Sequence, residues 1–178
     1  ALTRGVGGVA AALGLPLVLF LVLRPERFGI TPNSLDPIFY TGYAINFDDI
    51  AGAVGDRHYM VSRWTSYLPN RIATVIAGPH VGRLLLRWII AAAGVATLWR
   101  LRPAWSRGQR LVAGTVLVAS PIYMRAVLTD YVEYTVVGLG VCAVAVGLRP
   151  AQTLLSSVVF GMLLAAVGFA NPFRLLAA

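Results

Sequence analysis

Two short segments carry carboxylates in settings where a carboxylate can do chemistry. Asp36 opens an aromatic stretch, and Asp130 and Glu133 lie beside long apolar runs. A carboxylate within hydrogen-bond reach of an attacking hydroxyl group takes its proton. Asp130 and Glu133 are three residues apart, so on a helix both would face the same way. An acid pair near membrane depth is costly unless it is partnered, which makes this pair a functional candidate.

Arginines near these acids have the chemistry to bind an anion. A guanidinium group holds a phosphate through two hydrogen bonds and stabilises negative charge that develops on it. Arg83 and Arg87 are four residues apart at a predicted helix start, so they also fit an interaction with lipid headgroups. Arg63 stands beside Trp64, which is typical of an interfacial anchor. The candidates for phosphate binding are Arg63, Arg71, Arg83 and Arg87.

Each acidic candidate also has a structural interpretation. Asp36 precedes Pro37, the pattern of a helix N-cap followed by proline in the first turn. A capped turn would still hold a carboxylate rigidly, so capping and catalysis are compatible. Arg125 could neutralise the pair at 130 and 133, or that pair could lie in a solvated hairpin turn. Asp48-Asp49 resembles an exposed helix start or turn.

The sequence requires no particular cofactor. A divalent cation such as Mg²⁺ or Mn²⁺ could bind Asp36, Asp130 and His58, and His80 could also contribute, but no tight ligand spacing is present. Cys142 is the single cysteine, which excludes a disulfide or a zinc framework within the chain. We find no Walker loop, no dinucleotide fingerprint and no Ser-His-Asp order.

Composition indicates a membrane protein. Hydrophobic residues make up 58% of the 178 positions and charged residues only 12%, and the mean hydropathy is +0.75. A soluble domain of this size needs more charge to cover its surface. The net charge of +8 comes from 15 basic residues, all arginine. They lie between apolar runs, so they indicate membrane flanks and anionic lipid as a partner, with no nucleic acid.

The apolar runs predict an all-α fold, a polytopic helical bundle of about five transmembrane helices. Each run approaches the roughly 20 residues that cross a hydrocarbon core. Pro121 and Arg125 interrupt the third, and irregular backbone at that depth must face protein or a water-filled cavity. We expect residues 1–178 to be a single transmembrane domain and the N-terminal part of a longer protein. The predicted spans are Val6–Leu23, Val81–Trp99, Leu111–Val127, Tyr134–Leu148 and Thr153–Ala170.

Charges predict the orientation. The short loop Trp99–Arg110 is rich in arginine and tryptophan, which places it in the cytoplasm. With five alternating spans, all the acidic residues and both histidines then fall on the outer side. The long loop 24–80 becomes the first extracytoplasmic loop. Its aromatic residues alternate with Asp, Asn and Arg, a pattern that suits short helices at the membrane interface.

An ordered set of motifs resembles the GT-C superfamily of membrane glycosyltransferases, most closely its actinobacterial members. One apolar segment is followed by a long loop with an early Asp-Pro-x-x-Tyr-x-x-Tyr-Ala motif starting at Asp36. The other marks are Tyr59-x-x-x-Arg63, Pro69 and Ala77-Gly-Pro-His-Val-Gly-Arg83. The likeness covers the first half of the chain, and the second half matches by topology. The later helices and the C-terminal extracytoplasmic domain of that superfamily are missing.

The resemblance implies a transferase at the outer face of a bacterial plasma membrane. Its donor would be a sugar on polyprenyl phosphate, and its acceptor a glycan, lipid or protein. Asp36 matches the acid that serves as base or that orients the acceptor or a metal, and Asp130 matches the second acid. The substrate-binding positions would be Tyr40, Tyr43, Tyr59, Arg63, Arg83, Arg87 and Glu133.

Two other classes of function stay open. A transporter or flippase for a lipid-linked anion would place charged residues deep in its helices and carry an internal repeat. A structural subunit of a membrane complex would not need the polar, aromatic loop between Asp36 and Arg71.

Overall fold

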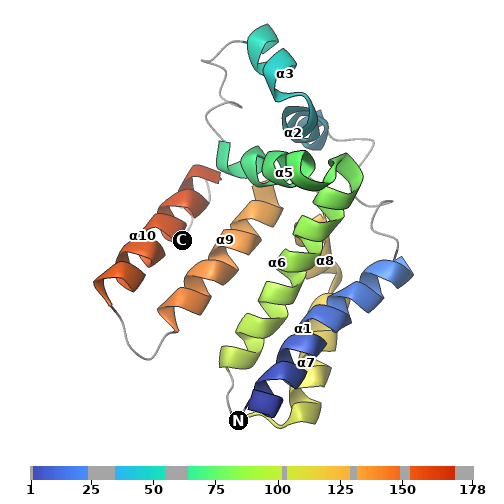
Figure 1. Ribbon diagram of the computed structural model, residues 1–178, viewed down its shortest axis with the longest axis vertical. Helices are drawn as coiled ribbons and strands as arrows, with labels where there is room; N and C mark the ends of the chain where they lie inside the picture. Colours follow the sequence, from blue (N-terminus) through green and yellow to red (C-terminus); the bar gives the residue numbers. More distant parts are fainter. Residues whose placement is uncertain are drawn as a thin grey trace.

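The fold is all-α, as the sequence predicts. The computed structural model describes residues 2–23, 35–54, 64–101, 104–128, 132–148 and 153–170. Within these ranges every regular element is a helix, and there is no strand (Figure 1). The helices are α1 (Leu2–Leu23), α2 (Leu35–Ile45), α3 (Phe47–Val54), α5 (Trp64–Ala77), α6 (Pro79–Leu101), α7 (Arg107–Ala119), α8 (Pro121–Leu128), α9 (Val132–Gly147) and α10 (Leu154–Ala170).

The five predicted apolar segments correspond to these helices. α1, α6, α9 and α10 each account for one segment, with ends within four residues of the predicted ones. The third segment is divided into α7 and α8, which meet at an angle of 62°. The break follows from the sequence, because Pro121 has no N–H to continue the ladder. The Ser120 backbone N–H donates to the Leu117 carbonyl (3.2 Å), and this contact closes the end of α7.

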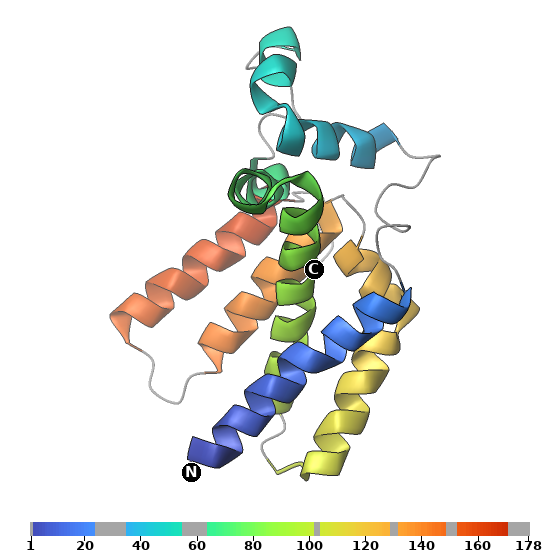
Figure 2. The ribbon, with the colours of Figure 1, turned by 45° about the vertical axis from the view of Figure 1, so that its right-hand side comes forward.

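The long helices alternate in direction and α5 lies across one end of them (Figure 1). At this end, named here the α5 end, α1 finishes, α6 and α9 begin, and α10 finishes against α5. α2 and α3 lie beyond α5 and farther from the bundle, with α2 crossing over α5 (Figure 2). The opposite end of the bundle contains the start of α1, the end of α6, the start of α7, the end of α9 and the start of α10.

Among the described helices, α6 is long and apolar enough to cross a membrane. α7 and α8 also meet this requirement if they are taken together as one bent span. Shorter apolar stretches lie in α1, α9 and α10, at Ala10–Val22, Tyr134–Gly147 and Leu154–Val167.

The main core forms where α1, α6, α7 and α8 meet. Its buried members include Phe20, Val95, Val118 and Val127. Two hydrogen bonds to main-chain carbonyls fix the helices around it. The Trp88 indole of α6 donates to the Leu13 carbonyl of α1 (2.7 Å), and the Trp99 indole donates to the Arg110 carbonyl of α7 (2.6 Å).

A sharp corner joins α5 to α6. Gly78 adopts φ = +80°, and its N–H donates to the Thr74 carbonyl (2.8 Å), which closes α5 with a left-handed cap. Pro79 then starts α6 at the position where a missing N–H costs least. The two helices touch at Gly82, where an added Cβ would lie 2.0 Å from the Ala73 carbonyl oxygen. The corner therefore explains Gly78, Pro79 and Gly82 of the motif at 77–83.

Candidate functional site

The α5 end gathers the acidic residues that the structure describes. Asp36 lies in α2, Asp48 and Asp49 in the first turn of α3, and Glu133 in the first turn of α9. His80, in the first turn of α6, is at the same end. The predicted one-sided distribution thus holds for these residues. Glu26, Asp56, His58 and Asp130 lie outside the described residues.

α2 is attached to α5 by aromatic rings. Tyr43 of α2 stacks on Tyr67 of α5 with ring centroids 5.1 Å apart, and Phe47 of α3 stacks on the same Tyr67 ring at 5.6 Å. Burial raises the pKa of the Tyr43 hydroxyl group. Burial and the nearby Tyr43 raise the pKa of the Tyr67 hydroxyl group, so both groups stay protonated at neutral pH. Tyr40 and Tyr43, predicted as substrate-binding, are each only 1% exposed and pack inside the protein.

Arg71 holds the junction between α2 and α3. Its Nη1 donates to the Ile45 carbonyl (2.8 Å) at the end of α2, and its Nη2 lies 3.7 Å from Asp48 Oδ2 in α3. Both contacts are intramolecular and give Arg71 a structural role, and its contact with a phosphate stays a prediction. Asp48 and Asp49 are exposed at a helix start, as the sequence predicts.

Asp36 lies inside α2 and not at its N-cap. The described helix begins at Leu35, so Asp36 and Pro37 both lie in its first turn. Positions 36, 40 and 43 follow the spacing of one helical face. Tyr40 and Tyr43 show that this face is the one packed against the protein. The side chain of Asp36 itself lies outside the described residues.

The two arginines at the start of α6 have different surroundings. Arg87, in the third turn, is 1% exposed, and its guanidinium carbon lies 3.4 Å from the centre of the Tyr134 ring in α9. The interpretation of Arg87 as a lipid-headgroup contact is therefore wrong, and an anion could reach it only from within the bundle. Arg83, one turn earlier, is half-buried and closer to the end of the helix. The contact of Arg83 with an anion stays a prediction.

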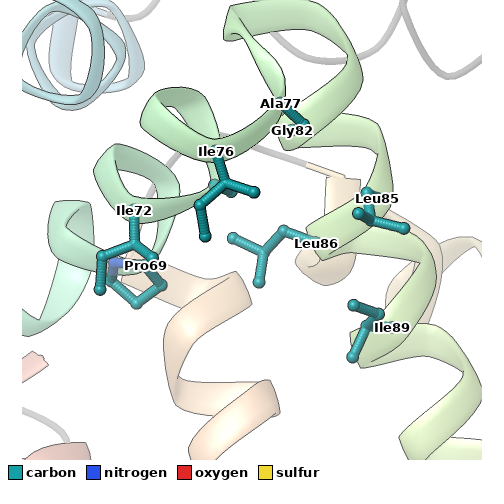
Figure 3. A pocket seen from close by; sticks show the side chains of 9 residues that line it. Pro69, Ile72, Ile76, Ala77, Gly82, Leu85, Leu86 and Ile89 are labelled. Atoms are coloured by element: carbon teal, nitrogen blue, oxygen red, sulfur yellow. The ribbon is translucent and has the colours of Figure 1, made fainter.

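An apolar groove occupies the angle between α5 and α6 (Figure 3). Its volume is about 330 Å³ and its lining is entirely apolar. The α5 side chains at i, i+3, i+4 and i+7 face those of α6 with the same spacing. The lining residues are Pro69, Ile72, Ala73, Ile76, Ala77, Gly82, Leu85, Leu86 and Ile89.

Some predicted site residues cannot be placed. Tyr59, Arg63, His58 and Asp130 lie outside the described residues, and Glu133 is placed only by its position in α9. Among described side chains no group of three or more His, Cys, Asp or Glu could hold a metal ion. The prediction of a divalent cation at Asp36, Asp130 and His58 stays a prediction.

Sequence reasoning missed the groove and the aromatic partners Tyr67 and Tyr134. The spacing of Pro69, Ile72, Ala73 and Ile76 on one helical face was a signal for the groove. The partner helix could not be found from that spacing.

A scan against protein-family models, a search of curated proteins and a search of solved structures each found no match.

Proposed function

We propose that this chain is a polytopic membrane glycosyltransferase that moves a sugar from a polyprenyl-phosphate donor to an acceptor at the outer membrane face. The single observation that carries the proposal is the apolar groove between α5 and α6, together with Arg83, which directly follows the lining residue Gly82 on α6. A lipid phosphate has a hydrocarbon chain, which the groove would accept, and an anionic head, which Arg83 would bind. The acidic helix positions lie at this same end of the molecule.

Exposed apolar side chains support the membrane location. Leu21 of α1 is 72% exposed, Val116 of α7 is 65% exposed and Leu154 of α10 is 85% exposed. Apolar surface spread over several helices is unfavourable in water, whereas hydrocarbon tails accept it. All five apolar segments would then cross the bilayer, the short ones with flanking residues at the interfaces.

α5 fits a helix that lies in the membrane interface. It crosses the ends of the long helices, and Ile72, Val75 and Ile76 are more than half exposed. An apolar stripe on such a helix rests among acyl chains at the headgroup boundary. The groove would therefore be at a depth where a polyprenyl chain can enter it while its phosphate stays near water.

Direct displacement at the anomeric carbon is the chemistry that these groups suit. The acceptor oxygen bonds to the anomeric carbon as the bond from that carbon to the phosphate oxygen breaks. Asp36 would take the acceptor proton, and polyprenyl phosphate would leave with the bonding electrons. Arg83 would stabilise the negative charge that develops on the departing phosphate.

A transporter or flippase of a lipid-linked anion is the second candidate. The break between α7 and α8 and the buried Arg87 in α6 favour it, because transporters use interrupted helices and charges inside the bundle. Movement of a fluorescent polyprenyl phosphate across liposomes without added acceptor would favour this candidate over a transferase.

Sugar transfer by the intact protein in nanodiscs tests the proposal. Asp36→Asn should reduce the transfer rate roughly a hundred- to ten-thousand-fold, because it keeps the side-chain volume but removes the base. The melting temperature should stay near that of the wild type. Asp48→Asn is the matched control, since Asp48 is exposed in α3, and it should transfer at the wild-type rate. Near wild-type transfer by Asp36→Asn would remove Asp36 as the base.

A further inference from the structure

The groove between α5 and α6 is small compared with a polyprenyl chain. Its volume is about 330 Å³ and its lining is apolar throughout. An apolar protein cavity of about 150 Å³ stays dry and takes one benzene molecule, which has six carbon atoms. By the same ratio this groove takes roughly a dozen carbon atoms, which corresponds to about two to three isoprene units. A chain of many isoprene units therefore fits only in part.

The groove narrows toward the corner where α5 meets α6. At this corner Gly82 lies against the Ala73 carbonyl oxygen, and the two helices diverge from there (Figure 3). Gly82, Ala73 and Ala77 are small, so they leave space beside a chain for its methyl branches. Farther from the corner, Ile72 and Ile89 are about half exposed. The wide end therefore opens to the outside of the bundle, and the rest of a bound chain can leave the groove there.

The corner end of the groove is its positively charged end. Arg83 directly follows Gly82 on α6, and α6 has no acidic residue in its first turn. The start of a long helix also carries partial positive charge. These charges favour an anionic head at the corner, with the attached chain running along the groove toward Ile89.

We propose that the groove binds only the two to three isoprene units nearest to the phosphate of the donor, and that the protein does not discriminate the length of the remaining chain. This inference rests on the proposed function, because it describes how much of that donor the protein contacts. The remaining units stay among lipid tails, which are as apolar as the groove. An isoprene unit therefore adds affinity only where it packs against protein side chains.

Competition binding with the intact protein in nanodiscs tests the inference. A fluorescent polyprenyl phosphate is displaced by unlabelled prenyl phosphates of one, two, three, four or ten isoprene units, each compared at equal mole fraction in the bilayer. The affinity should rise about tenfold between one and three units and change less than about twofold between three and ten. Dodecyl phosphate has a straight chain as long as that of the three-unit compound. It should bind several times more weakly, because it lacks the methyl branches.

Two substitutions in the groove should change the chain length at which the affinity stops rising. Ala73→Leu fills part of the groove, so the affinity should stop rising at about two units. Ile72→Ala enlarges the groove, so the affinity should still rise from three to four units. Val75→Ala is the matched control, because Val75 is an exposed residue of α5 that does not line the groove. It should keep the wild-type dependence on chain length. If Ala73→Leu does not accumulate, Ile72→Ala and its control decide the question.

The outcomes separate this inference from the proposed function. An affinity that rises steadily up to ten units would overturn the inference and leave the proposed donor in place. Equal binding of dodecyl phosphate and the three-unit compound would do the same, and it would assign the groove to ordinary lipid tails. An Ile72→Ala variant with the same length dependence as Val75→Ala would also overturn the inference. If neither the fluorescent probe nor any prenyl phosphate binds, the proposed function itself fails.

Discussion

The two ends of the helical bundle hold their polar groups in different ways. At the α5 end, the charged Arg87 and four tyrosines (Tyr40, Tyr43, Tyr67 and Tyr134) are buried, and α5 covers the bundle. At the opposite end, Arg100 in the last turn of α6 and Arg107 at the start of α7 are exposed. Ser106 and Gln109 close the start of α7 with a capping box. One end is organised by long-range contacts and the other by local ones.

This difference indicates where function is expected. A capped, exposed connection is stable by itself and tolerates change. Buried charges and polar groups are costly, so proteins retain them where they orient other groups. The α5 end is therefore the end at which substitutions should have effects beyond stability.

Cysteines placed at the two ends should differ completely in their accessibility to a reagent added outside the cell. In a Cys142→Ser background, Asn46→Cys at the α5 end should react with an impermeant maleimide added to intact cells. Ser106→Cys at the opposite end should react only after permeabilisation. Both native side chains are exposed, so burial does not limit either reaction. Labelling of Ser106→Cys but not Asn46→Cys in intact cells would reverse the orientation.

The corner of the α5 end should be intolerant of a single methyl group. Gly82→Ala places a Cβ 2.0 Å from the Ala73 carbonyl oxygen, so α5 and α6 must separate. We expect the free energy of unfolding to fall by about 3 kcal/mol. Gly161→Ala is the control, because it also lies inside a helix and has no atom within 4 Å of the added Cβ. Similar melting temperatures for the two variants would contradict the contact.

Arginines at the two ends should differ in their effect on donor binding. Arg83→Gln removes a charged hydrogen-bond donor from α6, one residue after Gly82 of the groove, and we expect the affinity for polyprenyl phosphate to fall about tenfold or more. Arg107→Gln changes an exposed arginine at the opposite end and should leave the affinity unchanged. Binding is measured by competition with a fluorescent polyprenyl phosphate in nanodiscs. Equal losses in both variants would indicate a general charge effect.

A substitution at the opposite end should lower the stability of the protein only slightly. Trp99→Phe keeps most of the ring but removes the indole N–H that donates to the Arg110 carbonyl. Loss of this hydrogen bond should cost about 1 kcal/mol and lower the melting temperature by about 2–4 °C. Trp64→Phe, at a half-exposed position in α5, serves as the control. A loss as large as that of Gly82→Ala would show that the two ends are equally interdependent.

The helices could be predicted from the sequence because long apolar runs are a local signal. Pro121 even marked the place where the third run breaks. The burial of individual polar residues could not be predicted in the same way. Arg83 and Arg87 share a helix, a residue type and a neighbourhood, yet one is half-buried and the other fully buried. That difference depends on α9, which begins 45 residues after Arg87 and whose packing no local pattern specifies.

The groove between α5 and α6 opens on the flank of the bundle, where Ile76 and Ile89 are exposed. In a bilayer, a lipid bound there exchanges sideways with its neighbours and never passes through water. Encounter then depends on the mole fraction of donor within the membrane and not on its amount per volume. Diluting the donor with inert phospholipid, at constant total donor, would slow a transferase of this design in proportion.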